Sequence, residues 1–202
     1  IYLQKFLEIS KRYHPGRLDK MLSENIFAYA NVPYRIKPYS DLVKNPFDTI
    51  QYDFAAEKIT KERVSNTGID GKLIWDKSNQ VMQVNFTEKI PATVLAKLSN
   101  FIPEAGIWLN TQRPEWNDAN NDLVGNGVSM VTLYYIRRLY AFCLELLNET
   151  SASQFEVSEE IAGFFNSLSK TFLQFESLLG RDVTDKERKL ITDALGNAGS
   201  IY

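Results

Sequence analysis

The spacing of apolar residues predicts helices in the first half of the chain. Apolar side chains recur every three or four residues from Tyr2 to Tyr13, and the pattern ends at His14-Pro15-Gly16, where the proline disfavours helix in the residue before it. Alternating charges at helical spacing predict a short exposed helix from Phe54 to Val64, which ends near Gly68. A third helix is expected from Pro91 to Asn100, because proline is tolerated in a first turn.

The second half carries the longest apolar pattern. Residues 123–147 are apolar on most faces, which predicts a helix buried on several sides. An amphipathic helix that reaches Leu179 is expected next, and Ser153 with Glu156 has the spacing of a capping box at its start. A second capping box, at Thr184 and Glu187, precedes a last helix that is expected to end at Gly196.

The segments between these helices are less regular. Between Ser23 and Phe54, aromatic residues and prolines occur without sustained periodicity, which predicts short helical turns and ordered loop. Two β-prone runs, 72–76 and 80–84, are separated by three polar residues and predict a β-hairpin. The fold class that follows is mainly α with a small β-hairpin insertion. An inner apolar helix beside amphipathic ones is typical of a helical bundle or a layered helical barrel.

Composition narrows the class of protein. With 202 residues, of which 44% are hydrophobic and 24% charged, the chain is long enough to bury a core as one domain over 1–202. It begins at Ile1 already in helical rhythm, so we expect it to be a fragment of a larger domain. The net charge of -2 balances 23 basic and 25 acidic residues without a basic run, so nucleic acid is not an expected partner.

The apolar runs and the scarcity of cysteine and histidine argue against membrane proteins and against histidine-based or metal-containing sites. The apolar runs are interrupted too often to span a bilayer, so no membrane association is expected, and no signal peptide is visible. The compartment, cytoplasmic or periplasmic, stays open. Cys143 is the only cysteine and is expected to be a core residue, and His14 is the only histidine. A histidine-based triad or metal centre is therefore disfavoured, and we expect no metal and no cofactor.

The candidate chemistry gathers in the segment 111–121. This segment combines a guanidinium, two carboxylates, an indole and several amides, and its candidate residues are Arg113, Glu115, Trp116, Asn117, Asp118, Asn120 and Asn121. An aromatic face suits a sugar ring, amides and a guanidinium suit its hydroxyls, and a carboxylic acid can protonate a leaving oxygen. Simpler interpretations are that Trp116 anchors the core, that the amides and carboxylates cap a helix, and that Arg113 pairs with Glu115 or Glu104.

The sequence Trp116-Asn117-Asp118 resembles the Gly-Asp-Trp-Asn-Asp-Gly motif of the cellobiose and chitobiose phosphorylase family. It resembles more loosely the acid loops of trehalases and other (α/α)6-barrel glycosidases. The resemblance extends over 113–125 and 129–138, where the chain is also similar to large bacterial proteins of that kind. It implies that the chain is part of an (α/α)6 toroid-type barrel and a fragment of its catalytic domain. It also implies that Asp118 is the general acid and that Trp116 shapes the sugar pocket.

Departures from the motif favour hydrolysis over phosphorolysis. Pro114-Glu115 stands where the family has Gly-Asp, Ala119 replaces its last glycine, and the family's phosphate-binding residues have no match here. The function expected is an inverting glycoside hydrolase with Asp118 as acid, in which the other six candidate residues bind an oligosaccharide or glycoside. A phosphate-dependent disaccharide phosphorylase and a noncatalytic carbohydrate-binding or scaffold module are the alternatives.

This mechanism makes two demands on its carboxylates. An inverting enzyme needs a second carboxylate about 6.5–9.5 Å from the first, and we expect it outside this chain because Glu115 is too near in sequence. Asp118 must also keep its proton, so its pKa should be raised by burial against Trp116 or by Glu115. If the helix expected over 123–147 begins beside Asp118, the helix dipole would lower this pKa instead.

Overall fold

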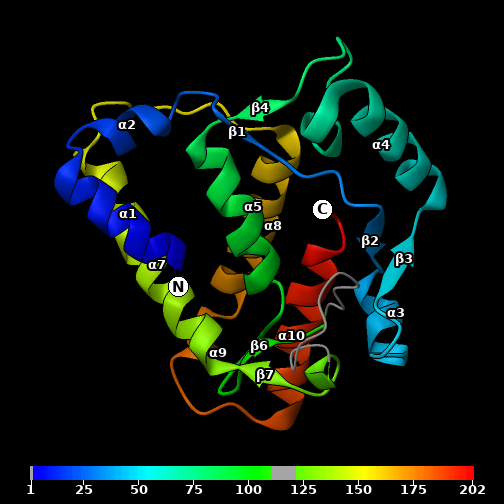
Figure 1. Cartoon of the computed structure of the whole chain (residues 1–202). Helices are drawn as coiled ribbons and strands as arrows, with labels where there is room; N and C mark the ends of the chain where they lie inside the picture. Colours follow the sequence, from blue (N-terminus) through cyan, green and yellow to red (C-terminus); the bar gives the residue numbers. More distant parts are fainter. Residues whose placement is uncertain (1, 111–121) are drawn as a thin grey trace.

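A computed structural model describes residues 2–110 and 122–202 of the chain, and this part is mainly helical (Figure 1). The helices are α1 (Tyr2–Tyr13), α2 (Arg17–Met21), α3 (Tyr39–Lys44), α4 (Phe54–Thr67), α5 (Phe86–Leu98), α7 (Met130–Glu149), α8 (Glu159–Gln174), α9 (Glu176–Leu179) and α10 (Asp185–Gly199), with a 3-10 helix, η1 (Gly68–Lys72), after α4. The mainly helical class expected from the sequence is confirmed.

The strands are short and form three small sheets. The strand β1 (Phe27–Ala28) pairs antiparallel with β4 (Gln83–Val84), and β2 (Tyr34–Ile36) pairs antiparallel with β3 (Ile50–Tyr52). The third sheet has the order β5-β6-β7, formed by β5 (Phe101–Ile102), β6 (Gly106–Trp108) and β7 (Val128–Ser129). This last sheet matters most for the candidate site, because 111–121 lies in the sequence between β6 and β7.

Helix α5 lies at the centre of the packing (Figure 1). Its Leu95 packs with the buried faces of α8 and α10, while its Phe86 packs with α1, α2 and α7. A third cluster joins Val94 of α5 to Ile107 of β6 and Ile136 of α7. Since α5 contributes a buried residue to each cluster, it connects the C-terminal helices to the sheet that precedes the candidate site.

Several predicted elements are confirmed by the structure. Helix α1 spans the expected residues and ends before Pro15. Helix α4 begins at Phe54, ends at Thr67 with Gly68 as its C-cap, and has no buried residue. The capping box of Thr184 and Glu187 is formed at the start of α10. Each of these signals is local, so distant parts of the chain did not alter them.

The long helix of the second half differs from its prediction. Helix α7 begins at Met130 rather than Leu123, and its N-cap is Ser129, whose side chain accepts a hydrogen bond from the Thr132 amide. The prediction that it is buried on several sides is wrong for this structure, since its buried residues are Ile136, Phe142 and Leu146. Cys143, expected in the core, is half-buried. The apolar residues of the other faces are exposed, among them Val131, Tyr134 and Leu144.

Two other helix starts are shifted. Helix α5 begins at Phe86 with Asn85 as its cap, so Pro91 stands inside the helix and not in its first turn. Helix α8 is capped by Ser158 rather than Ser153, because Ser158 accepts the Ile161 amide. A serine can cap a helix wherever the backbone enters one, so the local sequence alone does not distinguish Ser153 from Ser158. The course of the chain in the folded protein decides which of the two is the N-cap.

The predicted hairpin over 72–84 forms only in part. Trp75 and Val81 form an isolated antiparallel bridge, and the Asp76 amide donates to the Gln80 carbonyl over 2.8 Å. The Met82 amide also donates to the Ile74 carbonyl, but Gln83 and Val84 leave the hairpin and pair with β1. The first run also pairs outside the hairpin, since Leu73 forms an isolated bridge with Ala30. Each run therefore has a partner other than the one that its local sequence favours.

Candidate functional site

The residues predicted to form the site all lie outside the described part of the chain. They are Arg113, Glu115, Trp116, Asn117, Asp118, Asn120 and Asn121, which fall within residues 111–121. The described residues on either side, 106–110 and 122–129, form a connected base, which we call the stem. The stem fixes where the chain leaves and re-enters the described structure.

Backbone hydrogen bonds hold the two sides of the stem together. The Leu109 amide donates to the Gly127 carbonyl over 2.9 Å, and the Gly125 amide donates to the Leu109 carbonyl over 2.7 Å. These bonds extend the pairing of β6 with β7, in which Ile107 lies opposite Ser129. The chain therefore departs from and returns to neighbouring points of one small sheet.

Polar and aromatic side chains reinforce this base. The indole N–H of Trp108 donates to the Gly125 carbonyl over 3.0 Å, so one side chain joins both sides of the stem. Asn110 is buried, and its amide donates to Oδ1 of Asn100 over 2.7 Å. Buried side chains with satisfied hydrogen bonds define a single geometry, because leaving such a group unpaired costs about 1–3 kcal/mol.

Gly125 is needed for the close approach of a second segment to the stem. Its φ of 83° lies in the left-handed region, and a Cβ placed there would lie 2.5 Å from Cβ and 2.7 Å from the carbonyl oxygen of Pro46. Only glycine meets both conditions without strain. The loop after α3 is thereby held directly against the stem.

Helices α3 and α10 pack against the stem through Tyr39. Its ring lies edge-on to Trp108, with ring centroids 6.4 Å apart, and its hydroxyl donates to Oδ1 of Asp193 over 2.7 Å. Burial and this carboxylate both raise the pKa of Tyr39. Burial alone would raise the pKa of Asp193, but hydrogen bonds from Lys189 and Tyr39 lower it. Asp193 is therefore a paired anion that positions Tyr39.

Glu104 and Arg138 both form ion pairs in the described structure. Glu104, a proposed partner of Arg113, pairs with Arg188 at 2.5 Å and accepts the Val183 amide at 3.2 Å. The hydrogen bond from Arg188 is the main cause that lowers the Glu104 pKa. Arg138 of α7 is exposed and pairs with Glu8 at 3.5 Å. Both side chains therefore have ion-pair partners within the described residues.

The start of α7 changes the electrostatic expectation for Asp118. Because the helix begins at Met130 with Ser129 as its cap, its N-terminal dipole acts twelve residues after Asp118 in the sequence. The polar residues 117–122 therefore do not cap this helix. Asp118 itself lies outside the described residues, so the direction of its pKa shift stays a prediction.

Metal-binding clusters and membrane-spanning helices are both absent from the described ranges. Within residues 2–110 and 122–202, no group of three or more His, Cys, Asp or Glu is arranged to hold a metal ion. In the same ranges, no helix combines the length and the apolar character that crossing a bilayer requires. Comparison of the sequence with known protein families and with curated proteins finds no match.

Sequence reasoning missed the residues that build the stem. Tyr39 packs on Trp108 from 69 residues earlier, and Asn100 accepts a hydrogen bond from Asn110, yet none of these residues carries a motif. Gly125 was the one available signal, since a glycine close after a polar loop often marks a close backbone approach. The partner, Pro46, lies 79 residues earlier and could not be inferred from the sequence.

Proposed function

We propose that this chain contributes the general acid to the cleavage of a glycosidic bond, with Asp118 as the acid. The observation that carries the proposal is the sequence Trp116-Asn117-Asp118, which resembles the acid motif of (α/α)6-barrel phosphorylases and glycosidases. The mainly helical fold is compatible with part of such a barrel. Assignment to the barrel itself belongs to the proposal.

The stem supports the proposal on physical grounds. A general acid must stay within hydrogen-bonding reach of the leaving oxygen, and such positions are best held by segments fixed to rigid elements. The segment that carries Asp118 is joined to the β5-β6-β7 sheet at both sides, through Leu109 and Gly125. The buried Asn110 fixes its first side further.

In the proposed reaction, Asp118 gives its proton to the glycosidic oxygen as the bond from this oxygen to the anomeric carbon breaks. A water molecule attacks the anomeric carbon from the opposite face, and its proton passes to a second carboxylate. We place this base outside the chain. Trp116 stacks on the sugar, while Arg113, Glu115, Asn117, Asn120 and Asn121 bind its hydroxyls. No cofactor or metal takes part.

The sharpest test compares leaving groups in the full-length protein and its Asp118→Asn variant. A sugar leaving group needs protonation, whereas a dinitrophenolate leaves without it. The variant should therefore lose about 10²–10⁴-fold in kcat on an oligosaccharide and little on the dinitrophenyl glycoside. Equal losses on both substrates would show that Asp118 has a structural role and would refute the assignment.

The matched control is Asp122→Asn, the same substitution four residues along. Asp122 is exposed and lies outside the motif, so this variant should keep wild-type rates on both substrates. Proton NMR of the first product anomer then tests inversion at the anomeric carbon. Turnover that requires phosphate would identify a phosphorylase instead. Sugar binding without turnover would identify a noncatalytic carbohydrate-binding module.

A further inference from the structure

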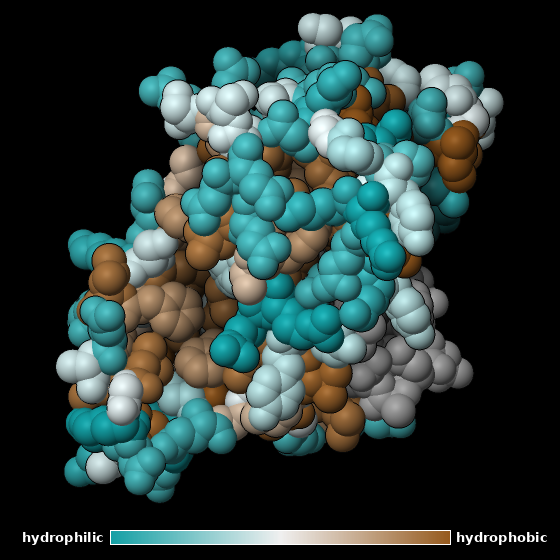
Figure 2. Space-filling view, turned by 90° about the vertical axis from the view of Figure 1, so that its left-hand side faces the viewer, coloured by the Kyte–Doolittle hydropathy of each residue, from teal (hydrophilic) through white to brown (hydrophobic). Residues whose placement is uncertain are grey.

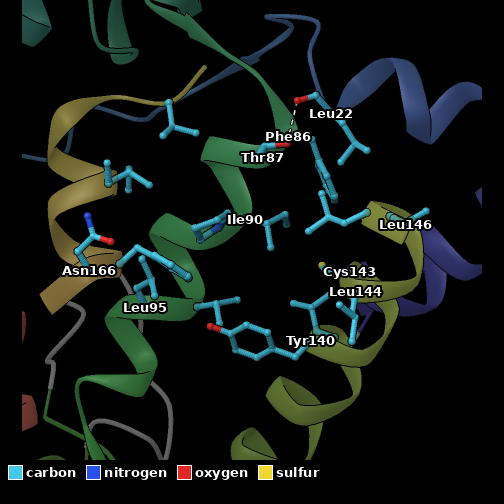
Figure 3. A pocket seen from close by; sticks show the side chains of 18 residues that line it. Leu22, Phe86, Thr87, Ile90, Leu95, Tyr140, Cys143, Leu144, Leu146 and Asn166 are labelled. Atoms are coloured by element: carbon cyan, nitrogen blue, oxygen red, sulfur yellow. Dashed lines mark hydrogen bonds between the residues drawn. The ribbon is translucent and has the colours of Figure 1, made fainter. Parts of the chain in front are cut away.

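An apolar cavity of about 470 Å³ lies between α5, α7 and α8 (Figure 3). Helix α5 contributes Ile90 and Val94, α7 contributes Leu139 and Cys143, and Ile161 and Phe165 come from α8. Apolar side chains also gather in a hollow on the face of the molecule that Figure 2 shows. The volume falls within the range of about 300–1,000 Å³ typical of sites for small ligands.

The lining offers few partners for water. None of the 18 lining residues is charged, and the polar ones are Thr87, Tyr140, Cys143 and Asn166. Thr87 already donates its hydroxyl to the Leu22 carbonyl over 2.8 Å. A well-held water molecule needs about two to four polar partners, which this lining offers at few places. An apolar molecule therefore displaces poorly held water here at a gain in free energy.

The charge of the lining decides the chemical class of the ligand. A fatty acid or another anionic lipid would bring a carboxylate or phosphate to a wall that has no cation to pair with it. Even partial loss of water around such an unpaired charge is unfavourable. A hydroxyl or ester group can instead bond to the exposed Tyr140 and Asn166 at the rim. The lining therefore fits an aliphatic chain with a neutral polar end.

We propose that the cavity between α5, α7 and α8 binds a small neutral aliphatic molecule, such as a medium-chain alcohol or ester. The three helices enclose the chain on three sides, as the side chains in Figure 3 point into a shared space. This proposal does not depend on the proposed glycosidase activity. The lining residues of the cavity lie on α5, α7 and α8 and beside them, and none belongs to the stem.

Binding can be measured with N-phenyl-1-naphthylamine, a neutral apolar dye that fluoresces in dry sites. We expect saturable binding of one dye per chain and displacement by decanol. Decanoate at pH 8 should displace the dye at least about tenfold less well, a difference of roughly 1.4 kcal/mol. Absence of saturable binding, or equal displacement by decanoate, overturns the proposal.

The native Cys143 supplies a second readout without any substitution. It is the single cysteine of the chain and lines the cavity, and burial raises the pKa of its thiol to about 11. Decanol should slow its alkylation by N-ethylmaleimide in proportion to dye displacement. Alkylation that decanol leaves unchanged contradicts the proposal. Protection that instead rises with protein concentration, without decanol, shows that a second copy of the chain covers the cavity, and it also overturns the proposal.

A filling variant and a matched control locate the site. Ala162→Phe adds a ring to the α8 wall and should weaken dye binding at least about tenfold, whereas Ala55→Phe, on the exposed face of α4, should leave it unchanged. Equal binding by both variants refutes the location. If Ala162→Phe fails to fold, the protection of Cys143 in the unaltered chain still decides the question.

Discussion

Replacement of Gly196 by alanine should destabilise the protein, although alanine is the better helix former. Gly196 lies in α10, and a Cβ at this position would lie 2.5 Å from both Cε2 and Cγ of Tyr39. The ring has no free direction in which to move, because its hydroxyl donates to Asp193 and its backbone amide donates to Oγ of Ser200 over 2.8 Å. The added methyl group must therefore displace a packed ring.

The magnitude follows from two opposing terms. Overpacking a well-packed site costs about 1–3 kcal/mol, and a contact this short places Gly196→Ala at the upper end of that range. The gain in helix propensity from glycine to alanine is about 1 kcal/mol. The expected net loss in the free energy of unfolding is about 1–2 kcal/mol. It should be measured by urea unfolding followed by circular dichroism.

Gly163 is the matched control for this substitution. It lies within α8, and a Cβ there would meet nothing within 4 Å, so Gly163→Ala should stabilise the protein by about 0.5–1 kcal/mol. In a Tyr39→Ala background, Gly196→Ala should also become stabilising, because the ring that it strikes has gone. The reasoning is refuted if Gly196→Ala stabilises the wild-type protein, or if its effect is the same with and without the ring of Tyr39.

Three further outcomes are expected. The hydrogen bond from Arg181 lowers the pKa of Glu187 from 4.5 to about 2, so the stability that the Glu187 carboxylate contributes is complete above pH 4.5 and is lost as the pH falls toward 2. Urea unfolding between pH 7 and 2.5 should show this loss of stability, and the loss should be smaller in Glu187→Gln. Asn85→Ala should lower the free energy of unfolding by about 2–4 kcal/mol, measured by thermal or urea unfolding. The substitution removes the N-cap of α5 and leaves the Glu156 carbonyl, before α8, without its hydrogen-bond donor. Gly125→Ala should lower stability, because its Cβ strikes Pro46 at the stem, and should also lower the proposed glycosidase activity. Activity at the wild-type level in the folded variant would show that the stem does not support the site.

Local signals in the sequence determined a large part of the helical framework. The end of α1 before Pro15, the end of α4 at Gly68 and the capping box at Thr184 each depend on a few adjacent residues, and all three appear in the structure. The residues that carry the proposed chemistry, Trp116 and Asp118, were also found from the sequence, through a motif. Their assignment as a site remains a prediction, because they lie outside the described residues.

Tertiary structure decided which apolar surfaces are buried and which segments meet. The apolar pattern of 123–147 did not reveal that the helix begins at Met130 or that Val131 and Leu144 are exposed, because periodicity reports the faces of a helix and not their neighbours. The meeting of Pro46 with Gly125 and of Tyr39 with Trp108 joins residues 69 or more positions apart. Such contacts arise from packing the whole chain at once, and no local pattern encodes them.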